Sequence, residues 1–456
     1  MSAPIAHKPR AVFTEGSTLK HLLVMTLTGS VGLMAIFIVE FFSLLYISWL
    51  NNPSLTAGIG FGGQVMFFAV SVNIGLSIGV SALVSRALGA GEVGSARRLA
   101  TTGLVHATIA SSLFSALLFP FRTELLQLLG ASGGALEAAR LFLDWTLPTI
   151  PLMGLGMALA AILRAVGDAK RAMYVTLFGA ISTAVIDPVL ILWMNQGIVG
   201  AAIAVNIARL VWVVVGMWGC VYVHRLLAPP TRAATARDLA PLLRIALPAI
   251  LTNFAAPVAM AFAVRTNAQF GEAAVAAGAI IDRVVPVAFG VLFAMSGVVG
   301  PIIGQNYGAK LYGRVRSTLT NCFAFSAIYA CLMWLVLALS APAVVWMFSA
   351  KGETAILVTF FCTWGAMAWA FLGCLFAANA AFNNLDYAFL STVFNWGRAT
   401  LGTIPFVTLG ALHFGAEGVI MGVTVGAAIF GVSAIVCAYW IAGRIEKKAL
   451  LDLQLS

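Results

Sequence analysis

The chain has 456 residues, of which 61% are hydrophobic and only 9% are charged, and its formal net charge is +10. Soluble domains carry about 25% charged residues, so this composition excludes a soluble protein and makes lipid the expected solvent for most of the chain. The apolar runs are continuous rather than alternating, which favours membrane-spanning helices over the strands of a barrel.

Twelve apolar segments follow one another along the chain, six before and six after a polar connector at residues 224–239. The connector contains a Pro-Pro pair and small residues, which is typical of a linker. We therefore predict an N-terminal six-helix lobe over residues 1–223 and a C-terminal six-helix lobe over residues 240–456. The first apolar run lacks a cleavage site and is expected to be an uncleaved transmembrane helix. The segments lie near residues 21–50, 55–84, 99–121, 143–165, 171–194, 197–223, 240–269, 274–303, 318–348, 355–382, 388–413 and 417–442.

Two basic, glycine-containing loops resemble each other: SRALGAGEVGSARRL at residues 85–99 and QNYGAKLYGRVRST at residues 305–318. Aligning Gly89 with Gly308 also aligns Arg97 with Arg316, at an offset of 219 residues. A loop that occurs twice indicates two related halves. Because each half holds an even number of segments, the repeats are expected to be parallel.

The basic residues indicate the orientation in the membrane. If the N-terminus is cytoplasmic, nineteen Lys and Arg residues fall on the cytoplasmic side and three fall in outer loops. This asymmetry predicts a multi-pass protein of the cytoplasmic (inner) membrane with both termini inside. The net charge is then explained by topology, and nucleic-acid binding has no further support. Four more arginines fall within the spans: Arg209, Arg265, Arg283 and Arg398.

Three acidic residues lie well inside apolar segments: Glu40, Asp187 and Asp282. A carboxylate in the membrane is costly and usually faces a partner or a water-filled cavity. Such a group can bind either a proton or a cation, so these residues are candidates for an ion-coupled transport site. The sequence has no phosphate-binding loop and no H-E-x-x-H motif, and its cysteines form no C-x-x-C pair. We therefore expect no enzyme activity, no cofactor and no metal site.

Short pieces along the chain carry a family resemblance. They are SRALGAGE from Ser85, LRAVGDAKR from Leu163, VIDP from Val185, AIIDR from Ala279, GQNYGAK from Gly304 and GRATLGTIPF from Gly397. In their order and spacing, the chain resembles the multidrug and toxic compound extrusion (MATE) family over nearly its whole length. The resemblance implies an all-α membrane protein with two six-helix bundles around a central cavity. It also implies export of organic cations, drugs or toxic compounds in exchange for H⁺ or Na⁺ by alternating access.

The resemblance also implies where the coupling site lies. Asp187 matches an acid of the family, and Thr183 stands where the family has an asparagine. The usual acid of the first helix falls on Ser43, whereas Glu40 lies three residues earlier and shares a helical face with it. We predict Glu40 and Asp187 as the coupled site, with Ser43 and Thr183 in support. The loss of the asparagine favours H⁺ over Na⁺.

Asp282 is followed at once by Arg283, and Arg265 lies in the preceding span. These three residues form either a structural ion-pair network in the second lobe or a substrate or ion site. Another branch of the family has acids in the first and fourth spans of the second lobe. In this chain the first span of the second lobe has no acidic residue, and the acid near the fourth span, Asp386, lies only at its end. This favours a coupling site in the first lobe.

The leading hypothesis is a monomeric secondary antiporter for cationic or amphipathic small molecules. A flippase for a lipid-linked or polysaccharide precursor is an alternative, because arginines such as Arg209, Arg265 and Arg283 would hold phosphates. A channel is compatible with two six-helix lobes, but no filter-like sequence or ring of like charges supports it.

Overall fold

The computed structural model describes residues 10–454, and all regular structure in that range is helical. The chain divides into two compact units. Unit 1 contains Leu27–Ile250, and unit 2 contains Phe13–Thr26 together with the chain from Leu251 onwards. The division lies inside two helices, α1 and α9, which therefore contribute to both units.

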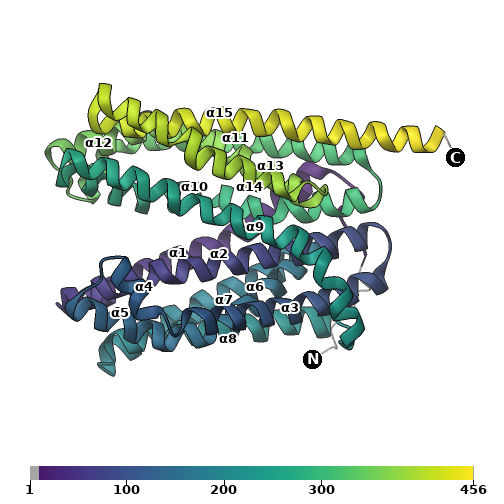
Figure 1. Cartoon of the computed structure of the whole chain (residues 1–456), viewed down its shortest axis with the longest axis horizontal. Helices are drawn as coiled ribbons and strands as arrows, with labels where there is room; N and C mark the ends of the chain where they lie inside the picture. The colour runs from purple at the N-terminus through teal and green to yellow at the C-terminus, as the bar shows by residue number, and fades with distance from the viewer. Residues whose placement is uncertain (1–9, 455–456) are drawn as a thin grey trace. The chain divides into compact units, whose positions relative to one another are not determined.

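In unit 1, α2 packs against α3, α5 and α6, and α7 packs against α8. Figure 1 shows α2, α3, α6, α7 and α8 running alongside one another. The helices of this unit are α1 (Thr18–Ser48), α2 (Pro53–Gly89), α3 (Val93–Leu118), α4 (Arg122–Leu128), α5 (Gly133–Thr146), η1 (Leu147–Thr149), α6 (Ile150–Ala165), α7 (Ala169–Pro188), η2 (Val189–Trp193), α8 (Gly197–Met217), η3 (Trp218–Val223) and the first part of α9 (Arg232–Asn267).

In unit 2, α13 packs against α10, α11 and α15, and these helices also run alongside one another in Figure 1. After α9, the helices of this unit are η4 (Ala268–Phe270), α10 (Glu272–Gly308), α11 (Tyr312–Met347), α12 (Gly352–Thr363), η5 (Gly365–Met367), α13 (Ala368–Asn384), α14 (Ala388–Gly397), η6 (Arg398–Gly402) and α15 (Ile404–Gln454).

The predicted spans agree with the helices of the described chain. Eleven helical stretches are long and apolar enough to cross a membrane, and the last runs over Ala388–Leu451. This stretch is interrupted at Gly415, whose φ of 60° and ψ of −142° are not helical. It therefore provides two spans, as the predicted segments 388–413 and 417–442 required. The prediction of an all-α protein with twelve spans in two bundles is confirmed.

The two halves repeat each other in their backbone. Helices α2 and α10 are both 37 residues long and begin 219 residues apart, and α3 and α11 begin at the same offset. The short helix η1 has its counterpart in η5, 218 residues later. The left-handed conformation of Gly197, with a φ of 53°, likewise returns at Gly415. The sequence repeat is thus a repeat of helix starts and breaks.

Short helix η1 interrupts the span formed by α5 and α6, and it leaves backbone carbonyls without helical partners. In unit 1, Arg209 is only 5% exposed, and its Nη1 donates to the carbonyl of Thr146 at 2.6 Å and to the hydroxyl of Thr149. In unit 2, the indole of Trp334 donates to the carbonyl of Thr363 beside η5 at 2.7 Å. Arg209 is therefore a structural donor and is not available for a phosphate.

Replacing Arg209 by methionine is expected to destabilise the protein. The change keeps much of the side chain's bulk but leaves the buried Thr146 carbonyl without this donor, which costs about 2 kcal/mol. The matched control is Arg140→Met, because Arg140 is exposed and lies 3.8 Å from Asp144; such surface pairs contribute at most about 1 kcal/mol. Thermal unfolding in detergent should show the larger loss for Arg209→Met, and equal losses would contradict the structural role.

Residues 224–239, predicted as a linker between the lobes, are hydrogen-bonded to helix α3 of unit 1. Asp238 is 4% exposed and accepts hydrogen bonds from Arg98 Nε at 3.0 Å and Thr102 Oγ1 at 3.1 Å. The amide of Ala228 donates to Thr101 Oγ1 at 2.9 Å. Helix α9 has already begun at Arg232, and the division between the units falls at residues 250–251. A buried and partnered carboxylate therefore attaches this segment to unit 1.

On the two sides of Gly415, the arm formed by η6 and the start of α15 packs against the rest of α15, backbone against backbone. A Cβ added at Gly426 would lie 1.8 Å from the carbonyl oxygen of Gly402, and one at Gly418 would lie 1.9 Å from that of Gly410. Glycines spaced four residues apart let helices approach closely in a membrane. The close packing of these two helical segments, which form a hairpin around Gly415, therefore depends on glycine rather than on interlocking side chains.

Candidate functional site

Ser43 on α1 and Asp187 on α7 meet inside unit 1. Asp187 is 1% exposed, and its Oδ2 is hydrogen-bonded to the Ser43 hydroxyl. Its second oxygen, Oδ1, is buried and has no hydrogen-bond partner. A buried carboxyl with an open oxygen is unusual, because buried polar atoms are normally satisfied. It is therefore the strongest candidate for a group that takes up an ion during function.

The Ser43 hydroxyl can serve Asp187 in either protonation state. Ser43 Oγ lies 3.0 Å from the carbonyl of Val39 as well as against Asp187 Oδ2. A hydroxyl has one proton to donate and two lone pairs to accept with. Ser43 can donate to an ionised Asp187, and it can accept from a protonated Asp187 while it donates to Val39. The pair therefore accommodates both the loss and the uptake of a proton.

The backbone changes directly after the acid. Pro188 has no amide hydrogen and ends α7, and η2 then continues as a short π-helix. Proline removes one helical hydrogen bond, and π-helical turns occur frequently at functional sites. The sequence I-D-P therefore places Asp187 directly before an interruption of the α-helical hydrogen bonds.

The structure places the other predicted first-lobe residues differently. Thr183 is 8% exposed, one turn before Asp187, and its hydroxyl donates to the carbonyl of Gly179 at 3.2 Å. It is therefore bonded to its own helix. Glu40 lies on α1 one turn before Ser43 and has an exposed side chain. Ser43 and Asp187, two of the four predicted residues, are hydrogen-bonded to each other.

The second-lobe candidates lie on α9 and α10. Arg265, Asp282 and Arg283 all have exposed side chains. No ion pair joins any two of them within residues 10–454. The charges of Asp282 and Arg283 nevertheless interact, and both arginine side chains are exposed.

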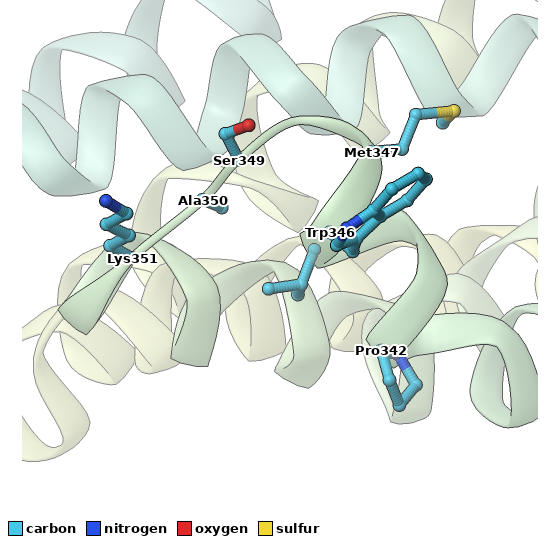
Figure 2. Close-up of a pocket in the computed structure, with 7 residues that line it drawn as sticks. Pro342, Trp346, Met347, Ser349, Ala350 and Lys351 are labelled. Carbon is cyan, nitrogen blue, oxygen red and sulfur yellow. The ribbon is translucent and has the colours of Figure 1, made fainter.

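One groove lies away from these residues. It has a volume of about 630 Å³ and lies between the end of α11 and the start of α12, where Figure 2 shows Trp346 and Lys351. Its lining is mainly apolar and contains no carboxylate. Chemistry rather than hollow space therefore identifies the candidate site. The groove is lined by Pro342, Val345, Trp346, Met347, Ser349, Ala350 and Lys351.

One polar cluster was missed by the sequence reasoning. Asp168 lies directly before α7. Its carboxylate accepts hydrogen bonds from the backbone amide of Arg171 at 3.0 Å and from the Arg171 guanidinium at 2.5 Å. It also lies 2.7 Å from His224 Nε2. Burial by itself would raise the pKa of Asp168, but the hydrogen bonds from His224 and Arg171 outweigh it and hold the pKa at about 2. An acid just before a helix was the available signal.

This cluster should make stability depend on pH. The folded pKa of Asp168 is depressed, so its contribution is complete above the ordinary value of 3.8 and is lost as the pH falls through about 2. The stability difference between wild type and Asp168→Asn, measured by unfolding in detergent, should be constant above pH 4 and shrink towards pH 2. The exposed Glu124→Gln serves as the control. A difference that grows on acidification would contradict the prediction.

Comparison with known proteins gives a consistent result. The MatE family model matches residues 30–189 and again residues 248–409. A FAD transporter of Shewanella oneidensis is 28% identical over 433 residues, which cover 93% of this chain and 94% of that protein. The multidrug export protein MepA of Staphylococcus haemolyticus is 22% identical over 359 residues, covering 76% and 77% respectively.

Solved structures have the same fold. A mutant of the Vibrio cholerae MATE transporter VcmN superposes with a TM-score of 0.88 at 25% identity, covering 95% of this chain and 97% of that one. An outward-facing multidrug resistance transporter gives a TM-score of 0.89 at 20% identity, with 97% and 99% covered. The second of these likenesses concerns the fold alone.

Proposed function

The chain belongs to the MATE family of membrane transporters, and from that premise we propose that it exports organic cations or other amphipathic small molecules in exchange for protons. Asp187 and Glu40 form the coupled site, and Ser43 holds the carboxyl of Asp187. Alternating access carries the substrate out, with both chain termini on the cytoplasmic side. The protein is a transporter and not an enzyme, as are the multidrug exporters that it resembles.

The observation that carries this proposal is the pairing of Asp187 with Ser43. Ser43 Oγ faces two acceptors, and both are satisfied when Asp187 is protonated. Losing that proton leaves a buried negative charge with one open oxygen. A buried carboxylate needs a counter-charge, and a cationic substrate can supply it. Proton and substrate would therefore bind in alternation.

The same geometry favours H⁺ over Na⁺. A bound metal cation takes several oxygen ligands. Among the described side chains, only the Ser43 hydroxyl is bonded to Asp187, and the Thr183 hydroxyl is occupied by the carbonyl of Gly179. A single proton needs no such ligand shell.

Transport into inverted vesicles tests the coupling ion. Vesicles containing the protein are loaded to be acidic inside, and uptake of ethidium, a planar organic cation, is followed by fluorescence. A proton gradient should drive uptake and an equal Na⁺ gradient should not. Uptake that follows Na⁺ at constant pH would overturn the proton assignment.

A second candidate is an exporter of anionic, phosphate-bearing substrates such as FAD. It is favoured by the exposed Arg265 and Arg283 of unit 2, because guanidinium groups bind phosphates well. The full-length similarity to a FAD transporter adds support. The same arginines would hold the phosphates of a lipid-linked precursor, which is the flippase alternative.

Proteoliposomes distinguish these substrates. Uptake of FAD that is lost in Arg283→Gln, with no uptake of ethidium, would favour the anionic substrate. Accumulation of a lipid-linked intermediate in a deletion strain would favour the flippase. Ethidium uptake that is unchanged in Arg283→Gln would favour the organic-cation exporter.

A further inference from the structure

Helices α1 and α7 run in the same direction and touch at two places. Gly32 lies against Thr176, and eleven residues further along each helix Ser43 lies against Asp187. Eleven residues make about three helical turns. Both contacts are therefore on the same face of each helix.

The Gly32 contact leaves no room for a side chain. Gly32 is buried, and a Cβ there would lie 2.1 Å from Thr176 Oγ1 and 3.1 Å from the carbonyl oxygen of Met173. The Thr176 hydroxyl is held in turn by its own bond to the Met173 carbonyl at 3.0 Å. A methyl group at residue 32 would therefore require α1 to move away from α7.

We propose that Gly32 is a positioning residue for the coupling carboxyl. Its missing side chain allows α1 to lie close enough to α7 for the Ser43 hydroxyl to reach Asp187. Helix α1 is continuous from Thr18 to Ser48, so a displacement at Gly32 is passed on to Ser43 three turns away. This inference rests on the proposed role of Asp187 in coupling, and it adds a residue that contacts neither proton nor substrate.

The test is a double-mutant cycle in proton-driven ethidium uptake. In the wild-type background, Ser43→Ala should lower the rate about tenfold, which corresponds to about 1.4 kcal/mol. Gly32→Ala should cause a similar loss, and Ser43→Ala should then cause no further loss, because the bond is already broken. If Ser43→Ala costs the same factor in both backgrounds, the inference is wrong.

Two further variants separate positioning from a general loss of packing. Thr176→Ala removes the hydroxyl nearest to residue 32, so Gly32→Ala/Thr176→Ala should recover part of the rate; a tight 3.1 Å contact to Met173 O remains. Gly63→Ala on α2, where a Cβ would meet nothing within 4 Å, should transport like wild type. A Gly32→Ala protein that matches Gly63→Ala would overturn the proposal.

If Gly32→Ala cannot be purified, the cycle is run with Gly32→Ala/Thr176→Ala. There the effect of Ser43→Ala should be smaller than in wild type, and an undiminished effect refutes the inference. The failure of the functional proposal looks different, because Asp187→Asn would then retain proton-driven uptake. An inactive Asp187→Asn together with a fully active Gly32→Ala would refute only the role of Gly32.

Discussion

Replacing Asp187 by asparagine is expected to reduce proton-driven transport to about one hundredth of the wild-type rate, a loss of about 2.7 kcal/mol in the barrier. Asparagine has nearly the same shape and can still accept a hydrogen bond from Ser43, so the contact between α1 and α7 persists. It cannot release a proton or carry a negative charge. The expected loss therefore affects coupling and not folding.

The measurement is initial ethidium uptake into vesicles at a fixed pH gradient, with the amount of inserted protein determined in parallel. Asp144→Asn is the matched control, because Asp144 is a carboxylate of the same unit that pairs with Arg122. It should transport normally. If Asp187→Asn remains active while Glu40→Gln is inactive, the coupling role belongs to Glu40.

The largest loss of stability is expected from Gly426→Ala. The added Cβ would lie 1.8 Å from the carbonyl oxygen of Gly402 and 2.5 Å from its carbon. Both are backbone atoms of the facing arm, so no side-chain rotation can relieve the overlap. Overpacking of this kind costs about 3 kcal/mol or more. The arms of the hairpin must separate, which also loosens their contact at Gly410 and Gly418.

Gly443→Ala is the control for this prediction. It lies on the same helix, and its added Cβ would meet nothing within 4 Å. Alanine is the better helix former by about 1 kcal/mol, so this variant should be as stable as wild type or more stable. Thermal unfolding in detergent compares the two. Equal midpoints would show that α15 and η6 do not need their close approach at Gly426 and Gly402.

The sequence was sufficient for the fold because the spans are long and apolar and the halves repeat. The break at Gly415 and the position of Asp187 inside a helix followed from local patterns. The hydrogen bonds that attach residues 224–239 to unit 1 could not be predicted, because the prolines and small residues of this segment do not indicate the partners of Asp238. Its partner Arg98 lies 140 residues away.

The site was predictable only in part, for the same reason. An acid inside an apolar run can be recognised alone, which is why Asp187 was found. Its contact with Ser43 joins residues 144 positions apart, and the resemblance to a family, rather than any local pattern, pointed to Ser43. The resemblance gave no such guidance for His224, which lies 56 residues from Asp168.

The short helices η1 and η5 have a consequence for how the two halves descend from one ancestral segment. The break is kept in both copies, but an arginine from α8 supplies the hydrogen bond in one and a tryptophan from α11 supplies it in the other. Positions with a positive φ are also kept in both halves while the residue differs. Gly91 in the first half corresponds to Lys310 in the second, and Gly167 corresponds to Asp386. After duplication, selection preserved the course of the main chain while side chains were exchanged. Backbone landmarks, not residue identity, should therefore set the register when the halves are aligned or swapped.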